Sequence, residues 1–523
     1  MTDTSSSYDE LPYGQCAFVQ VHPDRLAVVG ALHGLSPAPV DRCSVLELGC
    51  AVGGNLIPMA AALPASRFLG IDLSARQIEQ GRDLIEQFGL ENIELRRQDL
   101  MDFGDGDGPF DYILCHGVYS WVPPAVQDRI LSICKRRMTP GGLATVSYNA
   151  YPGWHEQQAV RDVLRYGARG ADGPARQVEQ AMAFLRFVAG SVFDAEGPYG
   201  RALHAAAESL SSAHPTYVFH EYLEDCNNPL SFEEFSRRAA AAHLRYVGDA
   251  DLYDPSNRLT DEARKRLTGI AADRVRCEQT LDFLRRRTFR RDVLCHDDVA
   301  VERWPAPAAL RGMLLLGQVE PLSDRPAEAP DAVEQFRNAR GQTLSTADPD
   351  LKTALRLLYR ARPRGVRAAK LMAKVRAARP QADEARLAQS LLACGMASLV
   401  ELHTHLPAIA TRPSDRPLAS VVARRQAAEG QYVVDLRHRI LQLDSLSRAV
   451  LAMLDGRHDR SDLCEALGEQ LRGGSLTIEP EPDGRPQTVT TGDLPRVVEG
   501  VLQALAGLCL LTGAGGGSGV TAP

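Results

Sequence analysis

The sequence predicts an α/β fold in which a doubly wound, seven-stranded sheet with helical insertions precedes smaller α+β units. Three observations predict it. Apolar runs alternate with amphipathic stretches through the first 150 residues, as in repeated strand–helix units. A glycine-rich turn follows the first apolar run, within Val45–Asn55. After about residue 330 the pattern changes to short helices and short strands.

The elements of the sheet follow in order. Strands are expected from Val45 into the glycine turn, then at Arg67–Leu73, Ile93–Leu100, Phe110–His116, Leu143–Asn149, Leu244–Ala250 and Thr288–Cys295. Helices are expected at Asp24–His33, Leu56–Leu63, Ala75–Phe88, Pro124–Met138 and Ser231–Ala242. Residues 154–219 and about 252–285 then become helical insertions at the carboxyl edge of the sheet, where ligands bind. We expect them to form a substrate lid.

The remaining chain is expected to form two winged-helix-like units. Their helices are predicted at Leu351–Tyr359, Val366–Ala377, Glu384–Ala393, Ser445–Leu454, Ser461–Leu471 and Leu494–Leu511. The expected boundaries are 1–153 for the core with strands 1–5, 154–219 for the insertion, 220–300 for completion of the sheet, 301–329 for a linker, 330–412 and 413–512 for the two units, and 513–523 for a flexible, glycine-rich tail.

Composition indicates a soluble, cytoplasmic protein. The 523 residues are 44% hydrophobic and 24% charged, with a net charge of -7 that gives no general attraction to nucleic acid or membrane. Eleven cysteines without a Cys-x-x-Cys pair indicate reduced thiols. The stretch Met1–Glu10 lacks the features of a signal peptide. The most apolar helix, Leu494–Leu511, carries Arg496 and Glu499, so no membrane span is expected.

Three acidic residues at strand ends point to the cofactor. Glu47, Asp72 and Asp99 end the first three strands and suit S-adenosylmethionine, whose amino group, ribose and adenine amine each need an acceptor. A nicotinamide enzyme would need only the ribose acid. Glycines in the turn would let the backbone approach the ligand, and amides at the helix start would offer donors. The predicted cofactor-binding residues are Glu47, Gly49, Cys50, Gly53, Asn55, Asp72, Leu73, Asp99, Leu100 and His116.

Two aromatic loops are candidates for the reacting site. His116–Pro123 follows the fourth strand and Tyr148–Trp154 follows the fifth, so both leave the sheet beside the predicted cofactor. Aromatic residues are more often core residues, but these lie in turns. An apolar pocket beside a sulfonium would favour the neutral form of a lysine amine, whose ordinary pKa is about 10.4. The predicted catalytic residues are Tyr13, Tyr119, Trp121, Tyr148, Asn149 and Trp154.

The same motifs resemble a known family. Glu47-x-Gly-x-x-x-Gly53 is similar to the first motif of class I methyltransferases. Ala51 replaces their middle glycine, and its methyl group is expected to narrow the space for the cofactor. The segments that carry the wider resemblance are Tyr8–Tyr13, Asn55–Ala60, His116–Pro123, Tyr148–Trp154, His220–Leu223, Phe232–Phe235 and Phe289–Arg291. Together they resemble bacterial class I methyltransferases with a methyltransferase regulatory domain, which include protein lysine methyltransferases of outer-membrane proteins. The resemblance covers nearly the whole chain. It implies S-adenosylmethionine as cofactor, a protein lysine as substrate and a regulatory region within 220–300.

Other functions remain open from the sequence. The acceptor could instead be RNA or a small metabolite, or the chain could be a sensor that binds the cofactor without catalysis. Eight basic residues and no acidic one lie in Arg360–Arg379, but the chain as a whole is acidic. Nucleic acid is therefore a less favoured partner of this segment than an acidic protein segment. His403-x-His405 lacks a third ligand, so no metal is expected. The oligomeric state is not predicted.

Overall fold

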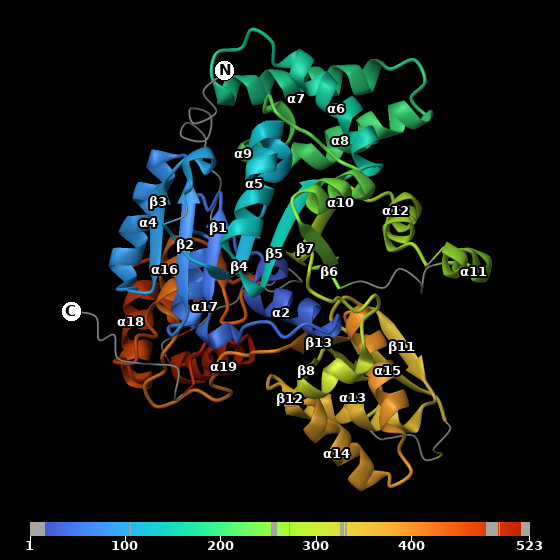
Figure 1. The fold of residues 1–523 in the computed structure, drawn as a ribbon. Coiled ribbons are helices and arrows are strands. Elements are labelled where there is room, and N and C mark those ends of the chain that lie inside the picture. Colours follow the sequence, from blue (N-terminus) through green and yellow to red (C-terminus); the bar gives the residue numbers. More distant parts are fainter. Residues whose placement is uncertain are drawn as a thin grey trace.

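A seven-stranded sheet organises the first 300 residues. The computed structural model describes residues 16–104, 106–252, 259–270, 272–324, 329, 332–476, 490 and 492–513. The strands are β1 (Ser44–Leu48), β2 (Arg67–Asp72), β3 (Ile93–Arg97), β4 (Phe110–Cys115), β5 (Met138–Asn149), β6 (Leu244–Asp249) and β7 (Phe289–His296). Their order is β3-β2-β1-β4-β5-β7-β6, with β7 antiparallel to both of its neighbours (Figure 1). The doubly wound sheet predicted from the sequence is confirmed.

Helices cover both faces of this sheet because alternate strand residues point to opposite sides. Val45 and Leu114 pack on the side of α2 (Pro23–Leu32), α3 (Leu56–Ala62) and α4 (Ala75–Phe88). Leu46 and Ile113 pack on the side of α5 (Pro124–Arg137) and α10 (Phe232–Ala241). The bounds of α4 match the prediction, because its end signals are strong. The Ser74 hydroxyl accepts the N–H of Gln77, and Gly89 ends the helix in a left-handed conformation.

The first insertion is a helical unit with a small core of its own. It contains α6 (Gly153–Gly167), α7 (Pro174–Ser191), α8 (Pro198–Ser211), α9 (Pro215–Val218) and a π-helical turn at Phe219–Leu223. Leu164, Leu185 and Leu203 are fully buried within it. Because α6 begins four residues after β5 ends, the unit lies at the carboxyl edge of the sheet (Figure 1). The second insertion contains α11 (Asp261–Ile270) and α12 (Arg274–Arg285), between β6 and β7.

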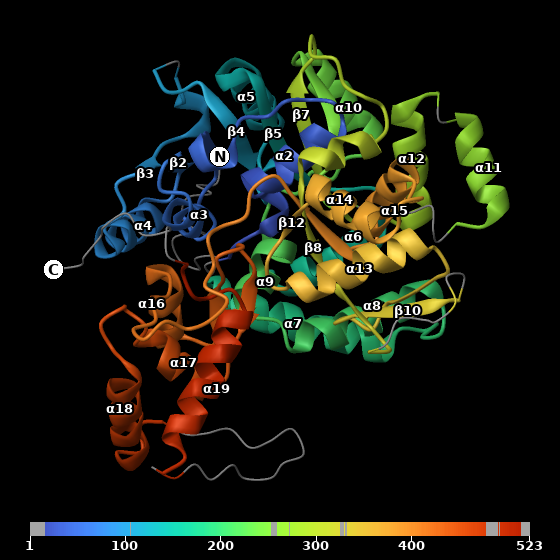
Figure 2. The same ribbon diagram turned by 90° about the horizontal axis from the view of Figure 1, so that it is seen from below.

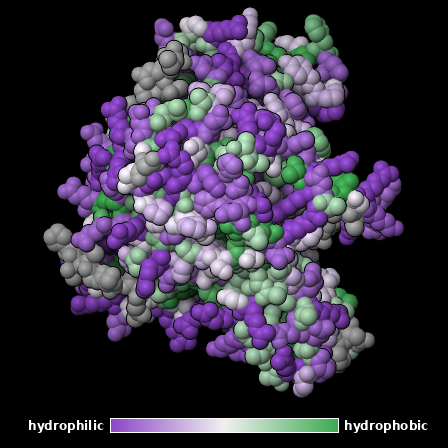
Figure 3. All heavy atoms as spheres, viewed as in Figure 1, coloured by the Kyte–Doolittle hydropathy of each residue, from purple (hydrophilic) through white to green (hydrophobic). Residues whose placement is uncertain are grey.

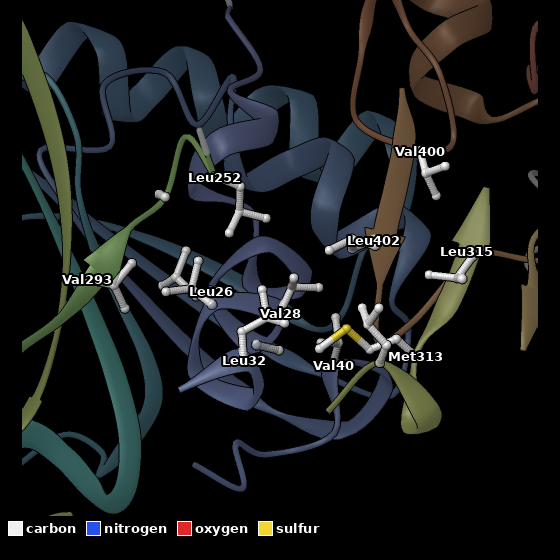
Figure 4. Packing of buried hydrophobic residues seen from close by; sticks show 14 of the residues in the cluster. Leu26, Val28, Leu32, Val40, Leu252, Val293, Met313, Leu315, Val400 and Leu402 are labelled. Carbon is white, nitrogen blue, oxygen red and sulfur yellow. The ribbon is translucent and has the colours of Figure 1, made fainter. Parts of the chain in front are cut away.

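The middle unit begins earlier than the sequence suggests. Its helices are α13 (Pro349–Ala361), α14 (Ala368–Ala378) and α15 (Glu384–Met396), and its strands include β12 (Val366–Arg367), β13 (Val400–His403), β10 (Glu334–Asn338) and β11 (Thr343–Thr346). The expected linker 301–329 is corrected, because it contains β8 (Leu314–Gly317), which pairs with β12 and β13, and β9 (Val319–Pro321), which pairs with β10. Since the partners of β8 lie far along the chain, no local hairpin signal marks it. Figure 4 shows Leu26 and Val28 of α2 between Val293 of the main sheet and Leu402 of this unit.

The C-terminal domain is a separate lobe beside α3. It contains α16 (Val421–Glu429), β14 (Tyr432–Val434), β15 (Ile440–Gln442), α17 (Ser445–Ala452), α18 (Arg460–Arg472) and α19 (Leu494–Gly507) around its own apolar core. In Figure 2 the domain lies next to the side of the sheet that carries α3 and α4, and α16 contacts α3. Of the expected tail 513–523, only Gly513 lies within the described residues. The face of the molecule in Figure 3 is mostly hydrophilic. Among the described residues, no helix combines the length and the apolar character needed to cross a membrane.

Candidate functional site

The glycine-rich turn after β1 has three residues in the left-handed region. Gly49, Ala51 and Gly53 have φ of 76°, 50° and 79°. A Cβ on Gly49 would lie 2.4 Å from Cγ2 of Val118, so glycine is required where the loop after β4 approaches. Ala51 keeps the backbone conformation that glycine would adopt, although it is strained by about 1–2 kcal/mol in doing so. The alanine therefore preserves the shape of the turn.

Hydrogen bonds within the protein build this turn. The N–H groups of Gly49 and Cys50 donate to the Ile71 carbonyl at 2.9 and 3.1 Å, and the N–H of Ala51 donates to Oδ2 of Asp72 at 2.8 Å. The Cys50 side chain is buried in the sheet core. That Gly49 and Cys50 line the cofactor site stays a prediction. Their N–H groups fix the turn against β2, and Asp72 is part of that structure.

Glu47 is a buried carboxyl group at the end of β1. Its side chain is 4% exposed, and Oε1 accepts Nδ2–H of Asn55 at 2.8 Å. Oε2 is buried and has no hydrogen-bond partner among the described residues. The pKa of Glu47 is raised to about 8, mainly by burial. The Asn55 hydrogen bond opposes this rise and the charge of Asp72 adds to it. An unsatisfied carboxylate oxygen here fits a cationic donor such as the amino group of S-adenosylmethionine.

The other two acidic residues lie along the same edge of the sheet. Oδ1 of Asp72 accepts the N–H of Ser74 at 2.9 Å, and the Asp72 carbonyl accepts the N–H of Gln98 at 2.8 Å, which aligns the ends of β2 and β3. Asp99 is exposed, and its carboxylate accepts the N–H of Met101 at 2.9 Å. Leu73 is 40% exposed beside them, while Leu100 packs against the sheet core. The structure thus brings the acidic residues to neighbouring strand ends.

Asn55 connects Glu47 to other segments. Its Oδ1 accepts the backbone N–H of Phe18 at 3.0 Å and contacts Nε2 of His438 at 2.8 Å. Since Nδ2 donates to Glu47, Asn55 supports the site through this carboxylate, and its direct contact with a cofactor stays a prediction. Sequence reasoning missed both Phe18 and His438. No sequence signal marks His438, which lies 383 residues from its partner.

His116 lies in an apolar environment after β4. Its ring centroid is 4.2 Å from that of Phe18 and 5.8 Å from that of Phe289. Burial lowers the pKa of His116 to about 3, with a smaller contribution from Arg291. Its Nδ1 is buried and has no partner within the described part of the chain. The imidazole is therefore neutral and lies between the rings of Phe18 and Phe289.

Tyr119 and Tyr148 are core residues, contrary to the expectation that they surround the reacting group. They are 0% and 1% exposed, and Tyr148 stacks on Phe235 of α10 with ring centroids 4.3 Å apart. The Tyr148 hydroxyl donates to Oδ2 of Asp292 at 2.6 Å. Tyr148 lies on the same strand face as Ala144 and Val146, which belong to the core on the α5 and α10 side. Both tyrosines therefore belong to the hydrophobic core, as aromatic residues commonly do.

Trp121, Asn149 and Trp154 form a second group. Trp121 ends a 3-10 helix at Tyr119–Trp121, Asn149 ends β5, and Trp154 lies in the first turn of α6. The rings of Trp121 and Trp154 meet edge to face with centroids 6.2 Å apart. Trp154 and Asn149 are 1% and 2% exposed, as buried as Tyr119 and Tyr148. The Asn149 N–H donates to the Ser120 hydroxyl at 2.8 Å, and its side-chain amide donates to Oδ1 of Asn227 at 2.9 Å. Sequence reasoning missed Ser120 and Asn227. Tyr13 lies outside the described residues.

His403 joins the middle unit to α2. Its Nδ1 lies 2.7 Å from Oδ2 of Asp24, and the N–H groups of Thr404 and His405 donate to Oδ1 of Asp24 at 2.7 and 2.8 Å. Burial alone would raise the pKa of Asp24, but the hydrogen bond and charge of His403 hold it well below its usual range. No cluster of three metal-binding side chains occurs among the residues that the structure describes.

Three family models match separate parts of the chain. Residues 45–142 match a methyltransferase domain, residues 214–296 match a predicted methyltransferase regulatory domain, and residues 415–510 match the PKMT C-terminal winged helix domain. The first model covers the strand ends described above. The third covers His438.

Relatives extend the likeness over most of the chain. An uncharacterized protein of Rickettsia prowazekii is 29% identical over 489 residues, covering 91% of this chain and 88% of that protein. Another from the same organism is 37% identical over 233 residues, covering 45% of this chain and 93% of that protein. The solved structure of PKMT2 from Rickettsia typhi in complex with AdoHcy has a TM-score of 0.85 and 27% identity, covering 96% of this chain and 100% of that chain. This chain therefore belongs to the bacterial class I S-adenosylmethionine-dependent methyltransferases that combine a methyltransferase regulatory domain with a PKMT-type C-terminal winged helix domain.

Proposed function

We propose that this enzyme methylates the side-chain amine of a protein lysine. The observation that carries the proposal is the likeness to PKMT2 of Rickettsia typhi, which covers 96% of this chain and includes the C-terminal domain. That protein was solved with AdoHcy, so we assign the corresponding cofactor site to the ends of β1, β2 and β3. Glu47 would accept the cofactor's amino group, Asp72 its ribose and Asp99 its adenine amine, while Leu73 would offer an apolar contact.

The chemistry requires a neutral amine aligned with the methyl group. S-adenosylmethionine supplies a methyl group on a sulfonium, and transfer is an in-line displacement in which positioning carries much of the rate. A lysine ammonium has no lone pair, so it must first lose its proton. The Trp121 and Trp154 rings would disfavour the cation by excluding water, and the Asn149 side chain would orient the amine. Tyr119 and Tyr148 take no part in this step.

Part of the basic segment of the middle unit is engaged within that unit. Arg376 pairs with Glu384, and Arg379 pairs with Asp350 at 2.7 Å. Arg362 donates to the Gly317 carbonyl at 2.7 Å. These three cations stabilise the middle unit itself, while Arg360, Arg364, Arg367, Lys370 and Lys374 of the same segment are exposed. The preference for a protein partner rests on the likeness to PKMT2. We also place the enzyme in the cytoplasm, since all eleven cysteines are free.

A labelling experiment tests the acceptor. The full-length chain is incubated with methyl-labelled S-adenosylmethionine and a heat-treated bacterial lysate, and labelled material is divided into protease-sensitive, nuclease-sensitive and small-molecule fractions. We expect label in protein, released by acid hydrolysis as methylated lysine. Label in RNA or in a small metabolite would contradict the proposal. Tight cofactor binding without any transfer would instead indicate a sensor.

Cofactor binding should strengthen as pH rises from 6 to 8. The pKa of Glu47 is raised to about 8, so this carboxyl group must lose a proton before it can pair with an amino cation. Affinity should rise by up to about tenfold per pH unit below that pKa. It should level off near pH 8, where the cofactor's own amino group, with a pKa of about 8, begins to deprotonate. Titration calorimetry from pH 6 to 8 measures the trend, and Glu47→Gln should remove it.

The protein without cofactor should show the opposite trend. Because the folded pKa of Glu47 lies above its unfolded value, the folded state binds the extra proton, and stability falls as pH rises from about 4.5 to about 8. Comparing the pH dependence of thermal unfolding between Glu47→Gln and the unaltered chain isolates this contribution to stability.

The binding measurement decides the role of Glu47. Equal pH dependence of cofactor binding in Glu47→Gln and the unaltered chain would contradict the assigned role.

A further inference from the structure

The turn between β14 and β15 places a buried histidine against the cofactor domain. His438 is 4% exposed and has φ of 64°, a conformation that residues other than glycine adopt uncommonly. Asp435 holds the turn, since its Oδ1 accepts the N–H groups of Arg437 and Arg439 at 2.9 and 2.8 Å. The Arg439 guanidinium pairs with the same carboxylate at 2.7 Å. The left-handed backbone conformation of His438 is thus held by the hydrogen bonds of Asp435. Such conformations are kept where they direct a side chain to a particular place.

Hydrogen-bond geometry determines which atom of His438 carries the proton. The backbone N–H of Phe18 is always a donor, so the Asn55 atom that it contacts at 3.0 Å must be the oxygen Oδ1. The opposite atom, Nδ2, then donates to Oε1 of Glu47 at 2.8 Å. Nε2 of His438 contacts the same Oδ1 at 2.8 Å, so it must donate. His438, Asn55 and Glu47 therefore form a directed chain of hydrogen bonds.

The surroundings of His438 keep the imidazole neutral. Burial lowers its pKa well below the ordinary value, and the neighbouring His22 lowers it further. The two rings have centroids 5.3 Å apart. Burial also lowers the pKa of His22 to about 4, and its Nδ1 accepts the N–H of Asp24 at 3.1 Å. A neutral His438 with its proton on Nε2 satisfies the observed geometry.

Attachment of the C-terminal domain does not require this polar contact. Helix α16 packs directly on α3, with Val422 of α16 buried in the same apolar core as Ile57 of α3. The Arg437 guanidinium also donates to the Pro363 carbonyl of the middle unit. An apolar side chain at position 438 would attach the C-terminal domain equally well. A buried histidine is costlier, because its ring nitrogens need hydrogen-bond partners. The donor directed at Asn55 therefore points to a role in the site.

We propose that His438 is a positioning residue of the cofactor site. By donating to Asn55, it fixes the amide that in turn holds Oε1 of Glu47, so that Oε2 stays directed to the cofactor's amino group. The C-terminal winged helix domain thereby completes the cofactor site of the core through the tip of its hairpin. The inference rests on the proposed role of Glu47 as a cofactor ligand.

Matched variants of the full-length chain test this role. His438→Phe keeps a ring but removes the donor, and we expect it to weaken binding of S-adenosylmethionine at least tenfold by calorimetry. His438→Gln restores an N–H donor and should bind within threefold of the unaltered chain. His458→Ala, in the same domain but paired with Asp455 and partly exposed, should leave binding unchanged. Equal cofactor binding by a folded His438→Phe variant would overturn the proposal.

A double variant separates this proposal from the assignment of Glu47. If His438 acts through Glu47, His438→Phe should weaken binding much less in a Glu47→Gln background than alone. Full additivity would overturn the positioning role. Unaltered binding by Glu47→Gln alone would instead show that the proposed cofactor ligand is wrong.

A further measurement needs no altered chain. With ¹⁵N-labelled histidine, the His438 resonance, identified by its absence from His438→Gln, should show the neutral form protonated at Nε2. A form protonated at Nδ1 would break the hydrogen-bond chain and overturn the proposal, even if His438→Phe does not fold.

Discussion

Replacing Asp72 with alanine should abolish measurable binding of S-adenosylmethionine, with an affinity loss of about a hundredfold or more. The Asp72 carboxylate accepts the N–H groups of Ala51 and Ser74, so it holds the glycine-rich turn as well as facing the proposed ribose position. Charge-assisted hydrogen bonds contribute about 1.5–3 kcal/mol each, and every 1.4 kcal/mol corresponds to a tenfold change in affinity. Titration calorimetry measures the loss.

A nearby acidic residue provides the control for this variant. Asp102 is exposed at the end of the 3-10 helix Leu100–Asp102, and Asp102→Ala should bind the cofactor within twofold of the unaltered chain. Circular dichroism establishes that both variants are folded. A folded Asp72→Ala variant with unaltered affinity would show that the cofactor site lies elsewhere.

The largest loss of stability is expected from Arg290→Met. Arg290 is 0% exposed, donates to both oxygens of Asp282 at 2.8 Å, and donates to Asp292 at 2.9 Å. Burial raises the pKa of Asp292 to about 7 although the Arg290 charge opposes this rise. Removing the cation leaves these carboxyl groups buried without their partner, which costs about 3–5 kcal/mol. Urea unfolding measures the free energy.

The control is an exposed ion pair on α10. Arg237 pairs with Glu234 at 2.8 Å, and its side chain is 69% exposed, so Arg237→Met should cost no more than about 1 kcal/mol. Similar losses for Arg290→Met and Arg237→Met would contradict the structural role of Arg290. Tyr148→Phe provides a related check, because it removes a hydroxyl that donates to Asp292. It should lower stability and leave the turnover rate within a few fold.

The sheet could be predicted because its signals are local. Strands β1, β2 and β4 are mostly apolar runs of five or six residues, and a cap and a left-handed glycine mark α4. The acidic strand ends were predictable for the same reason, since parallel strands bring their carboxyl ends to one edge. Residue type and position along the strand were sufficient to place Glu47 and Asp72.

The side-chain environment of the site was less predictable. Tyr148 and Asn149 are neighbours in sequence, yet strand alternation sends the first into the core and the second toward Asn227. The Tyr148–Trp154 motif alone does not indicate that α10 will cover the sheet face on which Tyr148 lies. Contacts between distant segments were also hidden, because nothing near His438 indicates that it will meet Asn55. Likewise, β8 becomes recognisable only when β13 pairs with it.

The contacts of the C-terminal domain change how its role is understood. A winged helix with a basic neighbouring segment suggests a mobile binding module. In the structure, His438 of the β14–β15 hairpin contacts Asn55, which supports Glu47. Asp24 of α2 contacts His403 of the middle unit. Both units therefore meet the short N-terminal segment that runs beside the glycine-rich turn. Truncation of the C-terminal domain would affect the cofactor site directly.

A structure of the full-length chain with AdoHcy tests the central claim most directly. We expect its amino group at Oε2 of Glu47, its ribose at Asp72 and its sulfur facing Trp121 and Asn149, with the contact from His438 to Asn55 retained. AdoHcy bound away from the ends of β1 and β2, or with its sulfur directed away from the Trp121 loop, would contradict the account.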